Sequence, residues 1–251
     1  MTDIEKEDYK ILSFETNARL YNEAPIDNVI KFEGVVKKVR NRETFKDKSY
    51  SFFKRAFDIV ASSTALVLLS PVFIATSIAI KKEDKGPAIF IQKRIGKDGK
   101  IFDLYKFRSM KENADKILFE MLQSDEEIAK EYDMYKKLKN DPRVTSVGKF
   151  IRRTSIDELP QLINIFKGEM SIVGPRPYLL REKEYMGEAY NSIIESKPGL
   201  TGLWQVSGRA STTFEERLEY DKQYVESKGA FYDMGILFKT ISSVAKGDGA
   251  E

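Results

Sequence analysis

The sequence predicts an α+β fold that is mostly helical, and three observations lead to this prediction. An apolar segment over residues 57–80 is interrupted by Ser70-Pro71, which predicts a helix–break–helix element. Two β-prone runs, 88–92 and 101–107, flank Asp98-Gly99 and predict a small β-hairpin. Most of the chain after the hairpin spaces its apolar residues as amphipathic helices do. The expected core is therefore a small hairpin-containing domain covered by helices.

Composition restricts the chemistry that the chain can perform. Of the 251 residues, 41% are apolar and 32% are charged, as in ordinary globular proteins. The chain contains neither cysteine nor histidine, which excludes disulfides, thiolate nucleophiles, zinc–cysteine sites and Ser-His-Asp triads. A net charge of +3 does not indicate nucleic-acid binding. The reaction must therefore use carboxylates, Lys, Arg, Tyr or Ser, with a hard metal ion as an available addition.

The chain is predicted to have three parts: a charged extension over 1–50, the broken helix over 51–82 and a domain over 83–251. The extension has no apolar h-region, so we expect no cleavable secretory signal and a domain that faces the cytoplasm. It is either a solvated tail or a weakly packed segment with a short strand at Val35-Val36.

The apolar segment 57–80 is long enough to cross a bilayer core of about 30 Å. Lys54-Arg55 and Lys81-Lys82 place positive charge at both ends, and such charge marks the cytoplasmic side. Pro71 removes one backbone hydrogen bond, and Ser70 could satisfy the carbonyl that this leaves free. Three arrangements are compatible with these residues: a re-entrant helix that returns to its own side, a kinked spanning helix, and a buried helix of a soluble core.

The hairpin is followed by helical sequence. Alternation along the second strand places Lys106 and Arg108 on one face, either as a phosphate-facing pair or as solvated strand ends. Residues 110–139 predict two amphipathic helices, separated near Ser124-Asp125, that cover the domain or lie on a membrane surface. A break follows at 140–142.

A second motif, PGLTGLWQVSGR, covers residues 198–209 and contains Trp204 and Arg209. Its three glycines predict a non-helical backbone that turns close to a ligand. Helices are expected over 213–224 and 231–244, the latter apolar on much of its surface.

The densest motif is the run over 151–177, IRRTSIDELPQLINIFKGEMSIVGPRP. Pro160 is tolerated only in the first turn of a helix, so the helix should begin between Ser155 and Leu159 and end at Gly168. Asp157 and Glu158 then lie at or beside its positive end, where a carboxylate stays ionised and a phosphate is attracted. The alternative is a structural one, with Asp157 as an N-cap and Glu158 as a solvated first-turn charge.

Arginines surround these carboxylates in the sequence. Arg152 and Arg153 precede them, and Arg176 lies in a stiff Gly-Pro-Arg-Pro turn, a typical device for bidentate phosphate recognition. Carboxylates with arginines and no histidine suit phosphoryl transfer with Mg²⁺, which prefers one or two carboxylates plus the phosphates of the substrate. An aspartate can also act as a nucleophile and form an aspartyl-phosphate.

Taken together, these motifs resemble the bacterial sugar transferase family, the monotopic phosphoglycosyl transferases that start exopolysaccharide, capsule and glycoprotein glycan synthesis. The matching motifs occur in the family order over about four-fifths of the chain: KRAFD at 54–58, Ser70-Pro71, YKFRSM at 105–110, the run 151–177, and 198–209. Residues 1–50 have no counterpart in short members and lack the multi-span bundle of long members. Residues 110–139 are longer than in the shortest members.

The resemblance implies transfer of a sugar 1-phosphate, of the glucose or galactose type, from a UDP-sugar to undecaprenyl phosphate with release of UMP. Asp157 would be the nucleophile, and Glu158, together with Asp157, would hold Mg²⁺. Arg152, Arg176 and Arg209 would bind phosphate, with Lys106 as an addition to that set. The resemblance also favours the re-entrant arrangement, which places the enzyme in the bilayer at the cytoplasmic face of the cell membrane.

Two other functions are compatible with the sequence. One is a non-catalytic, membrane-anchored module that binds anionic lipid or nucleotide-sugar and recruits other polysaccharide enzymes. The other is a direct glycosyltransferase, which would release UDP. The identity of the sugar, the role of residues 1–50 and the oligomeric state stay open, with a homo-oligomer as one option.

Overall fold

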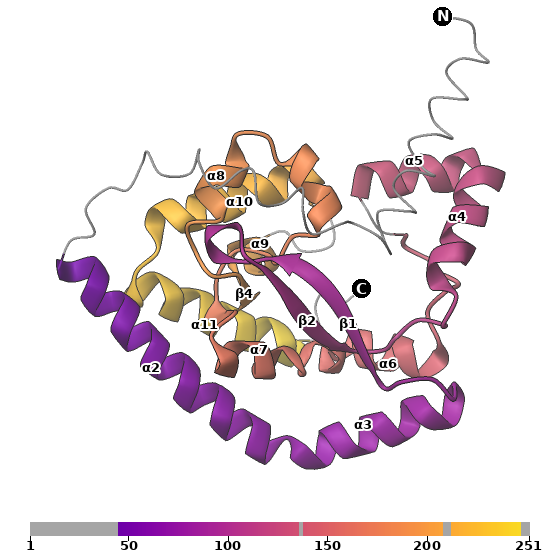
Figure 1. Cartoon of the computed structure of the whole chain (residues 1–251), viewed down its shortest axis with the longest axis horizontal. Helices are drawn as coiled ribbons and strands as arrows, with labels where there is room; N and C mark the ends of the chain where they lie inside the picture. Colours follow the sequence, from indigo (N-terminus) through magenta and orange to yellow (C-terminus); the bar gives the residue numbers. More distant parts are fainter. Residues whose placement is uncertain (1–44, 136–137, 208–211, 247–251) are drawn as a thin grey trace, which may run out of the picture. The chain divides into compact units, whose positions relative to one another are not determined.

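The computed structural model describes residues 45–135, 138–207 and 212–246, which are mostly helical with two small sheets (Figure 1). The predicted α+β class with a mostly helical content is confirmed. The chain divides into Met1–Ser49 and Tyr50–Glu251, and the following description concerns the second part. The predicted strand at Val35-Val36 lies outside the described residues.

The broken helix is present as predicted. Helix α2, Phe45–Leu68, is followed by α3, Ser70–Glu83, with Leu69 between them (Figure 1). Pro71 cannot donate to the carbonyl of Val67, and the Ser70 hydroxyl donates to that oxygen instead at 2.8 Å. In the described part of the chain no single helix is long and apolar enough to cross a membrane; residues 48–68 and 70–83 meet the criteria of length and composition only as a pair, bent by 59°.

The predicted β-hairpin is confirmed. Strand β1, Ile89–Ile95, pairs antiparallel with β2, Ile101–Phe107, from Ile89 opposite Phe107 to Ile95 opposite Ile101. The turn between them places Asp98 and Gly99 at φ angles of 58° and 74°, which suits the Asp-Gly pair. The inner face of β2 packs its buried Phe102 and Leu104 against helix α7. The hairpin therefore carries Lys106 at a fixed position above α7.

A second sheet was not predicted. Strand β3, Ser171–Val173, pairs parallel with β4, Gly199–Thr201. The two backbones approach so closely that a Cβ on Gly199 would lie 2.1 Å from the Gly174 nitrogen. Glycine at this position of the 198–209 motif therefore allows two backbones to pack. The prediction of a wholly non-helical motif is wrong, because Leu203–Ser207 forms the short helix α9.

The remaining predicted helices are confirmed. Asp125 separates α4 from α5 and caps α5, because its carboxylate accepts hydrogen bonds from the backbone N–H groups of Glu127 and Ile128. Thr213 and Glu216 form a capping box at the start of α10. The helices and 3-10 turns after the hairpin are α4 Ala114–Ser124, α5 Glu126–Tyr135, α6 Ser146–Arg153, η5 Ile156–Glu158, α7 Gln161–Lys167, η6 Leu180–Tyr185, α8 Ala189–Ile193, α10 Phe214–Ser227 and α11 Ala230–Lys246.

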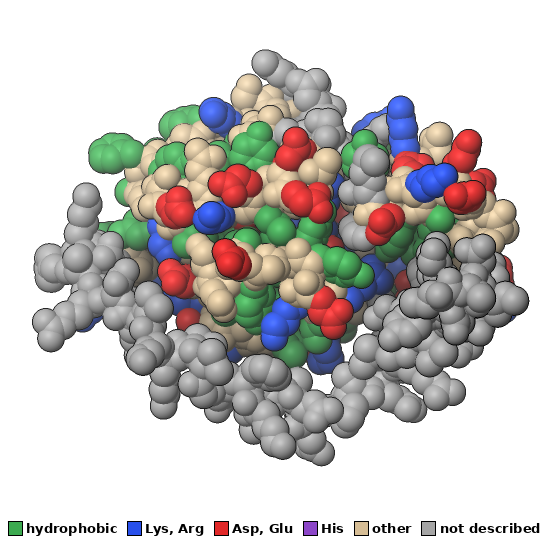
Figure 2. Space-filling view, turned by 90° about the horizontal axis from the view of Figure 1, so that it is seen from above, with side chains coloured by type: hydrophobic (Ala, Val, Ile, Leu, Met, Phe, Trp, Pro, Cys, Tyr) green, Lys and Arg blue, Asp and Glu red, His purple; other side chains and the backbone are tan. Residues whose placement is uncertain are grey.

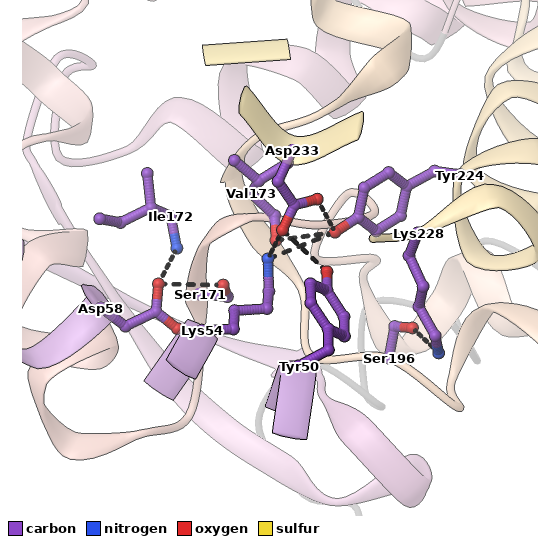
Figure 3. A network of polar contacts seen from close by, with 10 residues as sticks. All are labelled: Tyr50, Lys54, Asp58, Ser171, Ile172, Val173, Ser196, Tyr224, Lys228 and Asp233. Carbon is purple, nitrogen blue, oxygen red and sulfur yellow. Dashed lines mark hydrogen bonds and ion pairs between the residues drawn. The ribbon is translucent and has the colours of Figure 1, made fainter. Parts of the chain in front are cut away.

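A polar network joins α2 to the C-terminal helices (Figure 3). The Lys54 ammonium forms an ion pair with Asp233 on α11. The Asp233 carboxylate also accepts hydrogen bonds from the hydroxyl groups of Tyr50 and Tyr224, at 2.8 and 2.9 Å. Because the charge of Lys54 is matched and hydrogen-bonded, this mostly buried pair fixes the position of α2 on α10 and α11.

Two further side chains of α2 contact the β3 strand and helix α7. Asp58, which is buried, accepts hydrogen bonds from the Ser171 hydroxyl at 3.1 Å and the Ile172 N–H at 2.9 Å (Figure 3). Arg55 donates to the carbonyl oxygens of Ile165 and Phe166 at the end of α7, at 2.6 and 2.7 Å. The apolar helix pair is therefore hydrogen-bonded to α7 and β3, two segments that lie within the run 151–177.

Candidate active site

The adjacent carboxylates Asp157 and Glu158 lie on the 3-10 turn η5, between α6 and α7. Ser155 adopts a left-handed conformation with φ of 56°, which turns the chain sharply after α6. Helix α7 begins at Gln161 after Pro160 and ends at Gly168, as predicted for its end. The predicted start between Ser155 and Leu159 is wrong, because the residues before Pro160 form a separate turn that carries the carboxylates.

The environment of Asp157 differs from the one expected at a helix end. Burial raises the pKa of Asp157 to about 6, against the positive charges of Lys106 and Arg152 and together with the negative charge of Glu158. The side chain is still mostly ionised at neutral pH, as predicted, but its pKa is raised and not lowered, because the loss of water outweighs the favourable charges. A carboxylate with this pKa is largely deprotonated at neutral pH and is more basic than an exposed one.

Glu158 has the opposite shift. Burial alone would raise its pKa, but the charge and hydrogen bond of Lys106, with Arg176 and Arg94, hold the pKa of Glu158 below its usual range. The Lys106 ammonium donates to the Glu158 carboxylate at 2.9 Å, from β2 to the η5 turn. Two neighbouring carboxylates with pKa values pushed apart are typical of sites where each has a different task.

A pocket opens beside these two residues, and Glu158 is the one that lines it. Lys106, Glu158 and Arg176 line it together, so three side chains from β2, η5 and the turn after β3 meet in one place. Gln161, Trp204 and Leu200 contribute to the other walls. The two cations in the lining favour an anionic ligand.

Arg176 is held at the pocket through its backbone. Its N–H donates to the Asp221 carboxylate on α10 at 3.0 Å, and the Tyr178 hydroxyl donates to the same oxygen at 2.7 Å. The guanidinium carbon of Arg176 lies 5.5 Å from the ring centre of Trp204 on α9. Buried groups therefore fix the Pro-Arg-Pro turn through its backbone, and the Arg176 side chain lines the pocket.

Asp221 predicts a measurable effect of pH on stability. Burial raises the pKa of Asp221 to about 7 from an ordinary 3.8. The folded protein thus binds this proton more tightly than the unfolded chain does, so the stability that Asp221 contributes is full below about pH 4 and is lost as the pH rises to about 7. Between these pH values the free energy of unfolding of the wild type should fall by about 4 kcal/mol relative to Asp221→Asn. Thermal unfolding of both proteins in one detergent across this range measures it, and parallel pH profiles would contradict it.

The other predicted cations are placed differently. Arg152 lies outside the pocket lining and donates from Nε to the Ser109 hydroxyl at 2.9 Å, within the electrostatic reach of Asp157. Arg108 does not share the site with Lys106: it is buried, donates to the Asp84 carbonyl at 2.9 Å and pairs with the Asp84 carboxylate at 3.4 Å. The strand ends at Phe107, so simple alternation no longer applies to Arg108. Arg209 lies outside the described residues.

The carboxylates fit a magnesium ion only as a pair. In the described ranges no three acidic side chains come together to form a complete metal site. Mg²⁺ commonly binds one or two carboxylates and completes its shell with water and substrate phosphates, so Asp157 and Glu158 match this donor set. The depressed pKa of Glu158 supports it as the permanently charged member of the pair.

Several residues of the site were missed by reasoning from the sequence. Arg94, Gln161 and Asp221 belong to helices or strands that were predicted or partly predicted, but no local pattern distinguishes them from core or surface residues. Asp221 could have been noted as an acidic residue on the buried side of the 213–224 helix, between Leu218 and Val225. Arg94 and Gln161 can be recognised as site residues only once the fold brings β1, α7 and β4 together at one pocket.

The sequence matches the family described as "Bacterial sugar transferase" over residues 49–247. It is similar to an "Undecaprenyl-phosphate galactose phosphotransferase" of Salmonella typhimurium, 44% identical over 231 residues, which are 92% of this chain and 48% of that protein. It is 44% identical to the "Exopolysaccharide production protein ExoY" of Rhizobium meliloti over 78% of this chain and 87% of that one. A "UDP-glucose:undecaprenyl-phosphate glucose-1-phosphate transferase" of Klebsiella pneumoniae is 41% identical over 75% of this chain and 39% of its own length. The chain thus spans less than half of the length of the Salmonella and Klebsiella relatives.

Proposed function

This chain belongs to the bacterial sugar transferase family, and we propose that it transfers a sugar 1-phosphate from a UDP-sugar to undecaprenyl phosphate with release of UMP. The names of the Salmonella and Klebsiella relatives support undecaprenyl phosphate as acceptor and a galactose- or glucose-type sugar as the group transferred. The name of the Rhizobium relative supports a role in exopolysaccharide synthesis. This would be the first membrane step of that synthesis.

One observation carries the proposal: a carboxylate of raised pKa, Asp157, adjoins a pocket where Lys106, Glu158 and Arg176 converge. The two cations suit the diphosphate of a nucleotide sugar. A non-catalytic binding module would need the cations but gains nothing from an adjacent basic carboxylate.

The proposed reaction has two steps at one phosphorus atom. A carboxylate oxygen of Asp157 attacks the β-phosphorus of the UDP-sugar, and the bond from that phosphorus to the bridging oxygen breaks, so UMP leaves with the bridging oxygen. A phosphate oxygen of undecaprenyl phosphate then attacks the same phosphorus and releases the Asp157 carboxylate. Both steps conserve the sugar–phosphate bond, and Lys106 and Arg176 bind the oxygens on which negative charge accumulates.

Magnesium, held by Glu158 with Asp157, would neutralise the charge of the diphosphate when bound. In the free enzyme the Lys106 ammonium forms an ion pair with the Glu158 carboxylate at 2.9 Å, and so balances the charge of this carboxylate. Arg152, whose charge acts on Asp157, would add a further phosphate contact when the substrate is bound. Arg209 is proposed as a third arginine from the family resemblance alone.

The helix pair α2–α3 is proposed to enter one leaflet of the cell membrane and return to the cytoplasmic face. Exposed apolar side chains support this position in the membrane, because a surface that faces water rarely carries so many large apolar side chains. They lie on α2 and α3 and on α6, α7 and α11, which contact that pair: Phe52, Phe53, Phe57, Val60, Val67, Leu68, Ile74, Ile78, Phe150, Phe166, Phe231, Phe238 and Ile241. The face seen from above Figure 1 carries acidic and basic side chains interspersed among hydrophobic ones, as a water-facing surface does (Figure 2).

A re-entrant helix predicts that both of its ends face the cytoplasm. The wild type has no cysteine, so single reporter cysteines can be introduced at the exposed positions Ser51 and Lys85 without further changes. We expect Ser51→Cys and Lys85→Cys to react with an impermeant thiol reagent in inverted membrane vesicles and to be protected in intact cells. Labelling of one of them in intact cells would instead indicate a spanning helix.

The nucleotide product tests the proposed function. Full-length protein in detergent or nanodiscs, supplied with undecaprenyl phosphate, Mg²⁺ and a panel of UDP-sugars, is expected to release UMP with at least one glucose- or galactose-type donor. Release of UDP would indicate direct glycosyl transfer. Binding of the donor without release of either nucleotide would indicate a non-catalytic module.

A further inference from the structure

Gln161 is an unusual side chain in this pocket. It is 2% exposed, it lines the pocket, and within the described ranges no hydrogen bond joins its amide to another group; the amide atoms are not fully enclosed, which leaves them accessible at the pocket wall. Its neighbour on α7, Asn164, is also buried but is fully engaged, with the Asp103 carbonyl and the Tyr105 N–H among its partners. Buried amides are normally hydrogen-bonded, so an unpaired one at a pocket wall indicates a partner that arrives from outside.

Trp204, on helix α9, also carries a polar group without a hydrogen-bond partner among the described residues. Its indole nitrogen is buried and donates to no described residue, although it lines the pocket that contains Gln161. The guanidinium carbons of Arg176 and Arg217 each lie 5.5 Å from its ring centre. Because these two cations already interact with the aromatic ring, the group of Trp204 that is left for a ligand is its N–H.

The surroundings select the ligand chemistry. The indole N–H can only donate, and the Gln161 amide can donate, so a group rich in acceptor oxygens satisfies both. Lys106 and Arg176 in the same pocket favour an anionic group. Gln161 follows Glu158 by three residues, next to the turn that carries the reacting carboxylates. A neutral donor there can bind a phosphoryl oxygen without neutralising Asp157 or Glu158, as a further cation would.

We infer that the Gln161 amide and the Trp204 indole N–H form a neutral donor pair that binds oxygens of the nucleotide diphosphate. This inference deepens the proposed function and rests on it for the identity of the ligand. It assigns the pair to the phosphates shared by all UDP-sugars and not to the hydroxyl groups that distinguish one sugar from another.

Trp204 is the single tryptophan of the chain, so its fluorescence reports on this pocket directly. The full-length protein in nanodiscs is titrated with UDP, which contains the diphosphate but no sugar. We expect a saturable change of emission in the wild type and a dissociation constant raised about tenfold or more in Gln161→Met, which keeps the side-chain volume but removes the donor. Gln161→Glu, which adds a negative charge, should bind UDP more weakly still. Gln123→Met, at an exposed position on α4, should leave the affinity unchanged.

Turnover provides the second measurement. Gln161→Met and Trp204→Phe, which keeps an aromatic ring beside the arginines, should each lower kcat/KM by about tenfold or more, and by equal factors for UDP-glucose and UDP-galactose. Thermal unfolding identifies a variant that does not fold. If one of the two variants does not fold, the other one tests the inference. An unchanged UDP affinity in Gln161→Met, no emission change in the wild type, or a loss confined to one sugar would overturn the inference. A wild type that binds UDP but releases no UMP would overturn the proposed function alone.

Discussion

Replacement of Asp157 by asparagine is expected to reduce UMP release by at least about 10³-fold. Asparagine keeps the size of the side chain and can still hydrogen-bond, but its amide cannot attack phosphorus to form an acyl phosphate. Burial and the neighbouring Glu158 make the wild-type carboxylate more basic than usual. The other carboxylate on the η5 turn, Glu158, is paired with Lys106 and is not expected to replace it as nucleophile. Steady-state UMP release, with purified protein and saturating donor and acceptor, measures this loss.

The matched control is Asp115→Asn on the exposed side of α4, which should retain full activity. The Asp157→Asn protein should also bind UDP at least as well as the wild type, because removal of a negative charge from the phosphate site does not weaken the binding of an anion. Near-normal UMP release by Asp157→Asn would exclude the covalent mechanism.

Substitution of Glu158 by glutamine is expected to lower kcat by about 10²-fold and to raise the Mg²⁺ concentration required for half-maximal activity. Glutamine cannot pair with the Lys106 ammonium as a carboxylate does, and it is a poor ligand for a hard cation. The effect should be smaller than that of Asp157→Asn, because Asp157 and the substrate phosphates still offer oxygens to the ion.

The measurement is a Mg²⁺ titration of initial rates for wild type, Glu158→Gln and Glu219→Gln, the last at an exposed position of α10. Glu219→Gln should follow the wild-type curve. An unchanged Mg²⁺ dependence in Glu158→Gln, whatever the loss of rate, would show that Glu158 does not hold the ion.

Features with a local cause could be predicted from the sequence. The Ser70-Pro71 break follows from one missing N–H and one hydroxyl that replaces it at 2.8 Å. The hairpin follows from alternating strands and an Asp-Gly turn, and the start of α10 from the capping residues Thr213 and Glu216. Each of these causes acts within one element or between two consecutive ones, so no knowledge of the rest of the fold is needed.

Features that depend on distant segments could not be predicted. The β3–β4 sheet contains two three-residue strands, too short to show a period, which pair only because Gly174 and Gly199 allow close contact. Lys106 and Arg108 look equivalent in sequence, yet one meets Glu158 in the pocket and the other is buried against Asp84. The raised pKa of Asp157 likewise arises from burial by the fold, whereas local sequence suggested only the favourable helix end.

The central claim is that Asp157 becomes covalently attached to the phosphosugar. It is tested most directly by incubating the full-length protein with a labelled UDP-sugar and Mg²⁺ in the absence of undecaprenyl phosphate, followed by rapid acid quench, proteolysis and mass spectrometry. The predicted result is one sugar-phosphate adduct on the peptide that contains Asp157, absent from Asp157→Asn and discharged when undecaprenyl phosphate is added before the quench. Stoichiometric UMP release without any adduct, or an adduct on another residue, would contradict it.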